Sequence, residues 1–208
     1  MTKDINKRRR RKDARPSEII AAAFGEFEDK GFGGTTLGSI AARAGISRTT
    51  IYLYFDTKEA IFEAAMRGSV EQTIDAAAMV VQQAHGDFRT VFSHVVDMIY
   101  ARLVTGDASV LLRVLVAEGH EMQSLVALYR HEILSKGEST IRALIERGIA
   151  AGELAEEARS YDVRLLVSPA IFVAIWMRVF AQVEPLEVDA FKASHIKLVC
   201  DALIQSKA

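Results

Sequence analysis

The chain has 208 residues, of which 50% are hydrophobic and 25% charged, and its formal net charge is −1. Only 3 Pro and 13 Gly accompany abundant Ala, Leu, Ile and Glu, a composition that indicates a helix-rich globular protein and excludes a disordered or collagen-like one. The single cysteine, Cys200, excludes an intramolecular disulfide framework and a Cys-rich zinc site. The longest nearly apolar run, over residues 165–177, is too short to cross a bilayer, and no cleavable signal is visible. We therefore expect a soluble, cytoplasmic protein without a membrane partner.

Charge is distributed unevenly along the chain. Residues 1–60 carry 12 Lys and Arg against 8 Asp and Glu, a net of +4, whereas the remainder carries 14 against 19, a net of −5. The segment 7–12 consists of basic residues alone. This asymmetry predicts a basic N-terminal arm over residues 1–15, ahead of a domain that meets phosphate. A solvated tail without a partner is the alternative interpretation.

Most of the sequence after this arm has apolar residues at helical spacing, and it contains no convincing period-2 strand. We therefore predict an all-α fold with three short helices followed by about six longer ones. In chain order the predicted helices cover about residues 16–30, 37–44, 48–55, 56–83, 88–104, 108–117, 120–148, 160–183 and 187–206, with breaks expected near Gly137 and at Pro169.

Local signals set several of these boundaries. Pro16 opens the first helix, since proline is favoured at a first helical position. Gly31 stands where a left-handed cap would end that helix. Asp56 followed by Glu59 has the form of a capping box, which predicts the start of the long helix that follows.

The two short helices and the turn at residues 45–47 match the helix-turn-helix pattern, and Ser47 is the expected N-cap of the second helix. On the second of them, Ile51 and Phe55 lie four residues apart and are predicted to face the core. The opposite face carries Arg48, Thr49, Thr50 and Leu53. A small, mostly polar face on a short helix suits entry into the major groove of DNA.

The stretch from Thr36 to Glu59 resembles the signature of TetR-family regulators, and the resemblance covers about residues 16–65. Ala-Gly-Ile-Ser at 44–47, Ile-Tyr-x-Tyr-Phe at 51–55 and Lys-Glu at 58–59 stand at the expected separations. Two positions depart from the pattern. Gly38-Ser39 replaces a pair that is usually charged, and Thr49 stands where glycine is common.

The resemblance implies an N-terminal three-helix helix-turn-helix DNA-binding domain at residues 16–62, followed by a larger helical ligand-binding and dimerisation domain at residues 63–208. It also implies a transcriptional regulator, usually a repressor, that binds a palindromic operator on double-stranded DNA as a homodimer and is released by a small-molecule effector. We expect the dimer seam on the apolar helices over 161–183 and 187–206.

Nine residues are candidate DNA contacts: Thr36, Ser47, Arg48, Thr49, Thr50, Tyr52, Leu53, Tyr54 and Lys58. Arg48 has the chemistry to bond a guanine edge or a phosphate. Leu53 fits a thymine methyl group, unless it is an incidental exposed leucine. The resemblance supports sugar-phosphate contacts by the hydroxyls of Tyr52 and Tyr54. Lys58 lies in the first turn of the long helix, where backbone N–H groups and a cation together favour phosphate.

The second domain is less informative. Apolar residues at helical spacing are more often core than pocket, so the effector-binding assignment is a hypothesis. Its candidates are Phe92, Met98, Arg102, Tyr129, Phe172, Trp176 and Met177. The five histidines are scattered and form no metal-binding pattern, so we expect neither a metal nor a cofactor.

Two other classes of function compete with a DNA-binding regulator. An enzyme would need a clustered nucleophile, base or metal set, and the sequence shows none, so we expect no catalytic residues. A protein-interaction module would use the helix-turn-helix fold without DNA, and an acidic potential around residues 48–54 would favour it. Activation instead of repression also stays open.

Overall fold

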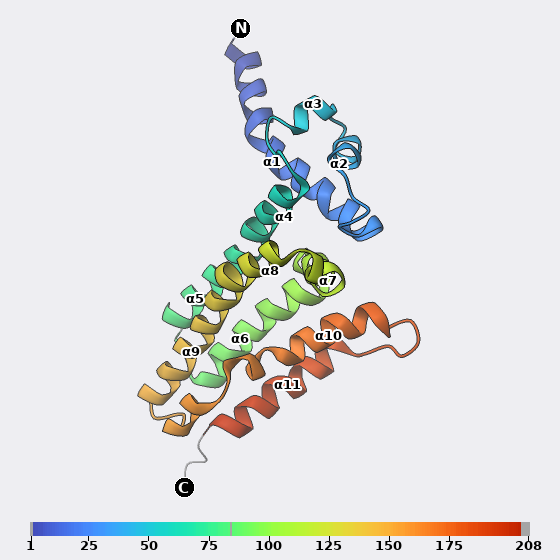
Figure 1. Ribbon diagram of the computed structural model, residues 1–208. Helices are drawn as coiled ribbons and strands as arrows, with labels where there is room; N and C mark the ends of the chain where they lie inside the picture. Colours follow the sequence, from blue (N-terminus) through green and yellow to red (C-terminus); the bar gives the residue numbers. More distant parts are fainter. Residues whose placement is uncertain (1, 84, 205–208) are drawn as a thin grey trace. The chain divides into compact units, whose positions relative to one another are not determined.

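The computed structural model describes residues 2–83 and 85–204, and nearly all of its regular structure is helical (Figure 1). The predicted all-α fold is confirmed. Within the described ranges no strand forms, and Leu154 and Ile204 make an isolated bridge. No helix among these residues has the length and apolarity needed to span a membrane. The chain forms two compact units. The first is Met1–Gly68 with Val110–Val126, and the second is Ser69–Ser109 with Ala127–Ala208.

The first unit contains the predicted helix-turn-helix. Its helices are α1 (Thr2–Lys30), α2 (Leu37–Arg43), α3 (Arg48–Ile51) and α4 (Lys58–Met66), joined by most of α7 (Ala108–Glu118), the 3₁₀ turn η3 (Gly119–Glu121) and the start of α8 (Gln123–Tyr129). Three mutually packed rings form the centre of its core. The ring centroids of Phe27, Phe32 and Phe62 lie 5.4 to 5.8 Å apart, so the end of α1, the following loop and α4 share one aromatic cluster.

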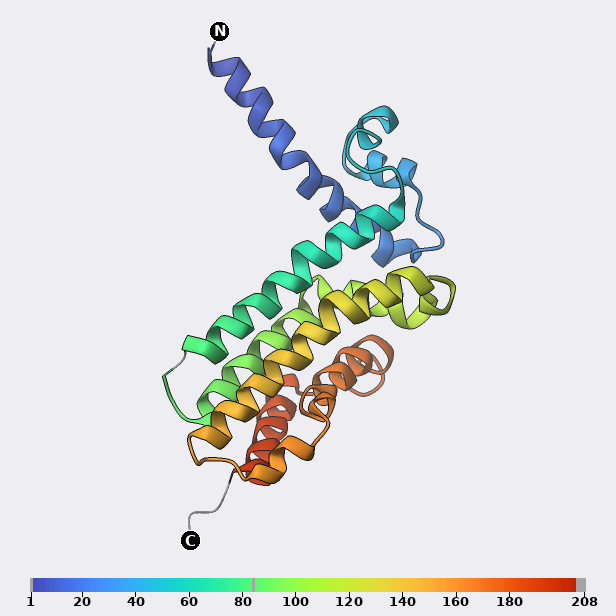
Figure 2. The same ribbon diagram turned by 60° about the vertical axis from the view of Figure 1, so that its left-hand side comes forward.

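The second unit is a helical bundle. Its helices are α5 (Gln72–Gln83), α6 (Phe88–Tyr100), α9 (Ser135–Ala150), α10 (Ser168–Val179) and α11 (Val188–Leu203), with π-helical segments η2 (Ala101–Thr105) and η4 (Arg130–Leu134) and 3₁₀ segments η5 (Glu156–Ser160) and η6 (Val163–Leu166). Helices α5, α6 and α9 run side by side, and α11 packs on α6 (Figures 1 and 2). Apolar residues from all these helices fill the core, including Phe92, Leu144, Val173 and Cys200.

A polar pair is buried within this core. The Tyr100 hydroxyl lies 3.2 Å from His195 Nδ1, and His195 Nε2 lies 2.9 Å from the carbonyl oxygen of Leu166. Because a carbonyl can only accept, Nε2 carries the proton and Nδ1 accepts from the tyrosine. The bonds join α6, α11 and η6, and burial lowers the pKa of His195.

Helix ends in the first unit differ from several predicted ones. Helix α1 begins at Thr2 and continues through Pro16, so the helix start predicted at Pro16 is wrong. The turn after Ile51 is tighter than a helix, so α3 is shorter than the predicted segment 48–55; the amide of Leu53 donates to the carbonyl of Thr50. Thr57 and not Asp56 caps α4, since the Thr57 hydroxyl accepts from an amide of the first turn at 3.1 Å.

The second half also shows two differences, whereas the break predicted at Pro169 is confirmed. Segment η6 ends at Leu166 and α10 begins at Ser168, with Pro169 in the first turn, where its missing N–H needs no partner. Gly137 lies inside α9, and the irregularity falls earlier, in η4. The last helix ends at Leu203, and the end predicted at Ser206 lies outside the described residues.

Candidate nucleic-acid interface

The helix-turn-helix is built by local backbone chemistry. Gly45 adopts φ +64°, a left-handed conformation that glycine takes without strain. The amide of Ile46 then bonds back to Ala41 at 3.0 Å and closes the turn. Ser47 caps α3 by accepting from the amide of Thr50 at 3.0 Å. The predicted turn and the predicted Ser47 cap are both confirmed.

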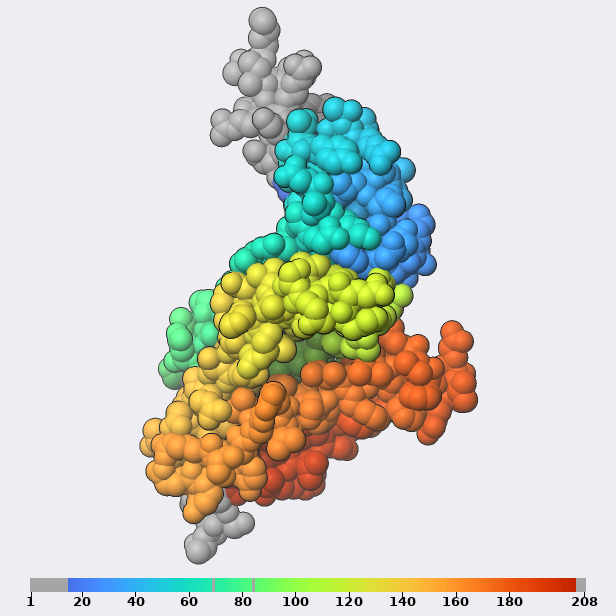
Figure 3. Space-filling view, viewed as in Figure 1, coloured from blue at the N-terminus to red at the C-terminus, as the bar shows by residue number. Residues whose placement is uncertain are grey.

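The face of α3 opposite the core is open to solvent. Ile51 is fully buried and anchors the helix, whereas Arg48 and Thr49 are exposed. Leu53 is 76% exposed and Tyr52 48% exposed. The segment from α2 to the turn after α3 lies at the surface in Figure 3. This face therefore presents one cation, hydroxyl groups and one apolar side chain on a short rod.

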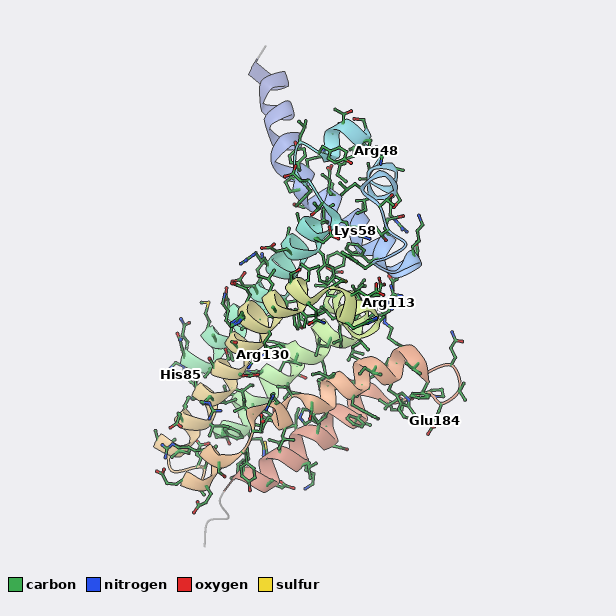
Figure 4. All side chains as sticks on the ribbon, in the orientation of Figure 1. Arg48, Lys58, His85, Arg113, Arg130 and Glu184 are labelled. Carbon is green, nitrogen blue, oxygen red and sulfur yellow. The ribbon has the colours of Figure 1, made fainter. Side chains whose placement is uncertain are left out.

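Arg48 lies over the start of α2 (Figure 4). A Cβ atom added to Gly38 would stand 3.7 Å from Arg48 Nε and 3.6 Å from Thr36 Oγ1. Thr36 and Ser39 form a capping box, in which each backbone amide donates to the other residue's hydroxyl. Of the two positions that depart from the usual family pair, Ser39 thus has a definite local role. At Gly38 a Cβ would make only ordinary van der Waals contact with the guanidinium, and Ser39 completes the capping box of α2.

The side chain of Lys58 forms its hydrogen bonds within the protein. Its ammonium donates to the carbonyl oxygens of Phe32 at 2.7 Å and Thr35 at 3.2 Å, and it lies 4.4 Å from the centroid of the Phe32 ring. The loop between α1 and α2 is therefore attached to α4 by this cation. A phosphate contact by Lys58 would require the ammonium to exchange these partners.

A buried carboxylate fixes α2 against α1. Glu26 is buried on α1 and accepts from Arg43 at 3.0 Å and from Lys30 at 2.7 Å. The hydrogen bond from Lys30, above all, lowers the pKa of Glu26. The Arg43 guanidinium also reaches Asp29 and passes 2.7 Å from where a Cβ of Gly25 would stand. These ion pairs were not predicted from the sequence, although an acidic residue, Glu26, among the apolar positions of a helix could have indicated them.

The candidate effector residues occupy different environments in the second unit. Phe92 is completely buried in the core, where its ring packs 5.6 Å from Phe88. Tyr129 is buried enough that its pKa rises to about 12. Phe172 and Met177 are exposed on α10. Met98 and Arg102 lie half-buried in α6 and η2. These placements do not test effector binding, and the assignment stays a prediction.

Trp176 borders a surface groove of about 360 Å³ between α10 and α11. Its indole N–H donates to the carbonyl of Glu184 at 3.0 Å, and its ring is tilted against the rings of Phe172 and Phe180, with centroids 5.5 and 4.8 Å away. The turn that carries Glu184 is labelled in Figure 4. Of the candidate effector residues, Trp176 alone lines this groove.

Two family models match the chain at the expected places. The model described as bacterial regulatory proteins, tetR family, matches residues 19–65, and the tetracyclin repressor-like C-terminal domain matches residues 82–194, more than half of the sequence. The chain belongs to the TetR family. The first match contains α2 and α3, and the second lies mostly in the helical bundle of this TetR-family protein.

Curated relatives of this TetR-family chain are regulators by name. An uncharacterized HTH-type transcriptional regulator of Bacillus subtilis, YdeS, is 25% identical over 138 residues, 66% of each chain. RutR of Escherichia coli K12 is 42% identical over 65 residues, 31% of each chain. The HTH-type transcriptional repressor KstR2 of Rhodococcus jostii is 26% identical over 200 residues, 92% of each chain. This chain thus spans just under two thirds of YdeS and about a third of RutR.

Solved structures share the fold. A putative regulator from Saccharomonospora viridis, in complex with choline, superposes with a TM-score of 0.77 at 17% identity, covering 93% of this chain and 100% of that one. FadR from Bacillus subtilis, in complex with stearoyl-CoA, gives 0.70 at 21% identity, covering 88% and 97%. At these identities the likeness establishes the fold alone.

Proposed function

We propose that this protein is a sequence-specific DNA-binding transcriptional regulator that acts in the cytoplasm as a repressor. The observation that carries the proposal is the solvent-exposed surface of α3 and of the turn after it. Arg48 and Thr49 lie on the helix, which a buried Ile51 holds, and Leu53 lies in the turn. A helix of this kind fits the major groove, which is about 12 Å wide. The membership of the chain in a family of regulatory proteins supports the same function.

In this proposal the exposed surface of α3 and of the turn after it reads the bases. Arg48 bonds a guanine edge or a phosphate, and Thr49 and Leu53 contact base edges and a thymine methyl. The hydroxyls of Tyr52 and Tyr54 bind the sugar-phosphate backbone. Four further candidates have hydroxyl or ammonium partners within the protein, so they would contact DNA by sharing or exchanging hydrogen bonds; they are Thr36, Ser47, Thr50 and Lys58.

Homodimerisation is the second part of the proposal. One recognition helix reads one half-site, so a palindromic operator needs two copies, with recognition helices about 34–36 Å apart. Helices α10 and α11 and the turn after α10 present an exposed apolar face that supports an interface between two copies. Its exposed members are Phe172, Ile175, Met177 and Val179 on α10, Phe180 and Val183 in the turn, and Leu198 on α11.

Release by a small-molecule effector is the third part. FadR and the S. viridis regulator were solved with stearoyl-CoA and choline, which supports a ligand for this chain without identifying it. We propose that the effector binds the second unit near the candidate residues of α6, η2, α8 and α10. A coupling free energy of about 1–3 kcal/mol would change DNA affinity about 5- to 150-fold.

Selection of bound sequences from random DNA tests the proposed function. We expect a palindromic consensus with half-sites one helical turn apart, and weaker binding when candidate small molecules include the effector. Thr49→Ala should relax the preference at one base position of each half-site, because a base-edge contact is lost. Recovery of no consensus, or binding without any salt dependence, would favour the alternative of a protein-interaction module.

A further inference from the structure

The loop between α1 and α2, residues Gly31–Thr35, is held from two sides by groups of opposite charge. On one side the ammonium of Lys58, which can only donate hydrogen bonds, donates to carbonyl oxygens of the loop. On the other side the carboxylate of Glu118, at the end of α7, accepts from the amides of Phe32 at 2.8 Å and Gly33 at 2.5 Å. The carbonyl groups of the loop thus accept hydrogen bonds from a cation, and its amide groups donate hydrogen bonds to an anion.

The glycines of this loop make room for the Glu118 carboxylate. A Cβ atom at Gly31, which has φ +71°, would stand 2.8 Å from Glu118 Oε1, and one at Gly33 would stand 3.1 Å from Oε2. Side chains at these positions would push the carboxylate away from the amides. The glycine-rich loop is thus shaped to receive a residue 85 positions further along the chain.

A second side chain of α7 reaches the same place. Arg113 donates through its guanidinium to the carbonyl of Phe27 in the last turns of α1, and Figure 4 labels Arg113 on α7. A cation at the C-terminal end of a helix is favourable, because the carbonyls there carry partial negative charge. Together, Arg113 and Glu118 attach α7 to the end of α1 and to the loop that leads into α2.

We propose that Glu118, assisted by Arg113, is a positioning residue through which α7 sets the orientation of the helix-turn-helix for DNA binding. The loop leads directly to Thr36, the cap of α2, and α2 packs against α3. Helix α7 begins at Ala108, in the second unit, and its residues from Val110 on belong to the first unit. The inference rests on the proposed DNA-binding function. It places residues of the C-terminal family region within the DNA-binding machinery.

The first experiment compares variants of the full-length chain on DNA recovered by selection. Glu118→Ala removes both acceptors and should weaken binding about tenfold, on the scale of lost hydrogen bonds to a charged group. Glu118→Gln keeps one carbonyl oxygen and should give a smaller loss. Glu121→Gln is the matched control and should leave affinity unchanged, since Glu121 is exposed and lies 3.6 Å from His120 at the surface.

Two readouts separate positioning from general stability. The slope of log affinity against log salt should be the same in Glu118→Ala as in the wild type, because no phosphate contact is removed. Hydrogen exchange should accelerate in the peptide that covers residues 31–35 and not in α6 or α9. Uniform acceleration along the chain would show global destabilisation and would overturn the proposal.

A double-mutant cycle tests the contact from the loop side. Gly33→Ala should weaken DNA binding, because the new Cβ displaces the carboxylate. In the Glu118→Ala background the same substitution should add no further loss, whereas additive losses would overturn the proposal. Should Glu118→Ala fail to fold, wild-type affinity in both Glu118→Gln and Gly33→Ala would overturn it instead.

These outcomes distinguish the inference from the function on which it rests. A wild-type chain that selects no DNA sequence contradicts the proposed function and the inference together. A wild-type chain that binds its operator, with Glu118→Ala binding equally well, contradicts the positioning role alone.

Discussion

Lys58 and Arg48 are cations of the same unit with different surroundings. Lys58 is half-buried and donates to backbone carbonyls of the α1–α2 loop, whereas Arg48 is exposed beside Gly38. An ammonium that satisfies carbonyls contributes to folding, since those carbonyls would otherwise lose a charge-assisted bond. An exposed guanidinium contributes little to folding and is available to DNA.

Lys58→Met should therefore lower the free energy of unfolding by about 1–2 kcal/mol, because it removes the charge-assisted bonds to the loop. Urea titration followed by circular dichroism measures the change. Arg48→Ala is the comparison variant. It should change stability by less than about 0.5 kcal/mol and weaken operator binding by about 1–3 kcal/mol. A Lys58→Met variant with wild-type stability and a reduced salt slope would instead support a direct phosphate contact.

His195 makes the free energy of unfolding depend on pH. Burial lowers the pKa of His195, so the folded state holds the neutral ring while the unfolded chain takes up a proton below about pH 6.5. The unfolded state then binds more protons, and stability falls as the pH drops from 6.5 toward the folded pKa. At neutral pH the contribution of the buried, hydrogen-bonded ring is fully present.

The His195→Gln variant tests this sign. It should be less stable than the wild type at pH 7, because the bonds to Tyr100 and Leu166 are disturbed. The difference in unfolding free energy should narrow at pH 5.5, since only the wild type loses stability through this histidine. Urea titrations at both pH values measure the two differences. A difference that widens on acidification would show that the folded state stabilises the protonated ring.

At the scale of elements, local chemistry explains what could be predicted. The turn at Gly45 and the cap at Ser47 depend on residues within a few positions of one another, and both are as predicted. The cap of α4 depends on a one-residue difference in register that a pattern does not resolve. Thr57 and Asp56 are both good caps, and backbone geometry decides between them.

Contacts distant in sequence could not be predicted in this way. The bonds of Glu118 to the α1–α2 loop span 85 and 86 residues, and no periodicity connects their ends. The same holds for Lys58, whose partners lie 23 to 26 residues away. Its position in the first turn of a helix suggested a phosphate contact, but the carbonyls of a glycine-rich loop also suit an ammonium.

The exposed face of α10 and α11 leads to a prediction about assembly. Phe172 is 46% exposed and Leu198 71% exposed, and apolar area of this kind is covered in a stable dimer. Phe172→Glu combined with Leu198→Glu should give a monomer in sedimentation velocity and should reduce operator affinity, because two half-sites are no longer bound together. Met79→Glu is the control, since Met79 is 56% exposed on α5 and outside this face. A dimer that survives the double substitution would place the interface elsewhere.

At the scale of the whole molecule, a single chain carries two compact units, and helices α7 and α8 have residues in both. The division follows the two family regions only in part, because Val110–Val126 groups with the N-terminal unit although it lies inside the C-terminal match. The domain boundary expected near residue 62 divides the chain by sequence order alone. Packing assigns residues by contact, so a unit can include segments that are far apart in the chain.

The basic arm connects charge to the function of the whole chain. Residues 1–12 carry seven Lys and Arg, and each phosphate that they neutralise should contribute about 0.9 to the slope of log affinity against log salt. Deletion of residues 1–12 should therefore flatten this slope and weaken binding to operator and scrambled DNA alike. Fluorescence anisotropy at several salt concentrations measures both slopes.

Replacement of Arg8, Arg9, Arg10 and Arg11 by Gln is the matched variant, because it removes charge while keeping the length of α1 and residues that favour a helix. Charge-driven binding predicts a flatter slope in both variants. A flatter slope in the deletion alone would indicate that the length of α1 matters and not its charge. An unaltered slope in both would mean that the arm makes no contact with DNA, and phosphate binding would then rest on the helix-turn-helix alone.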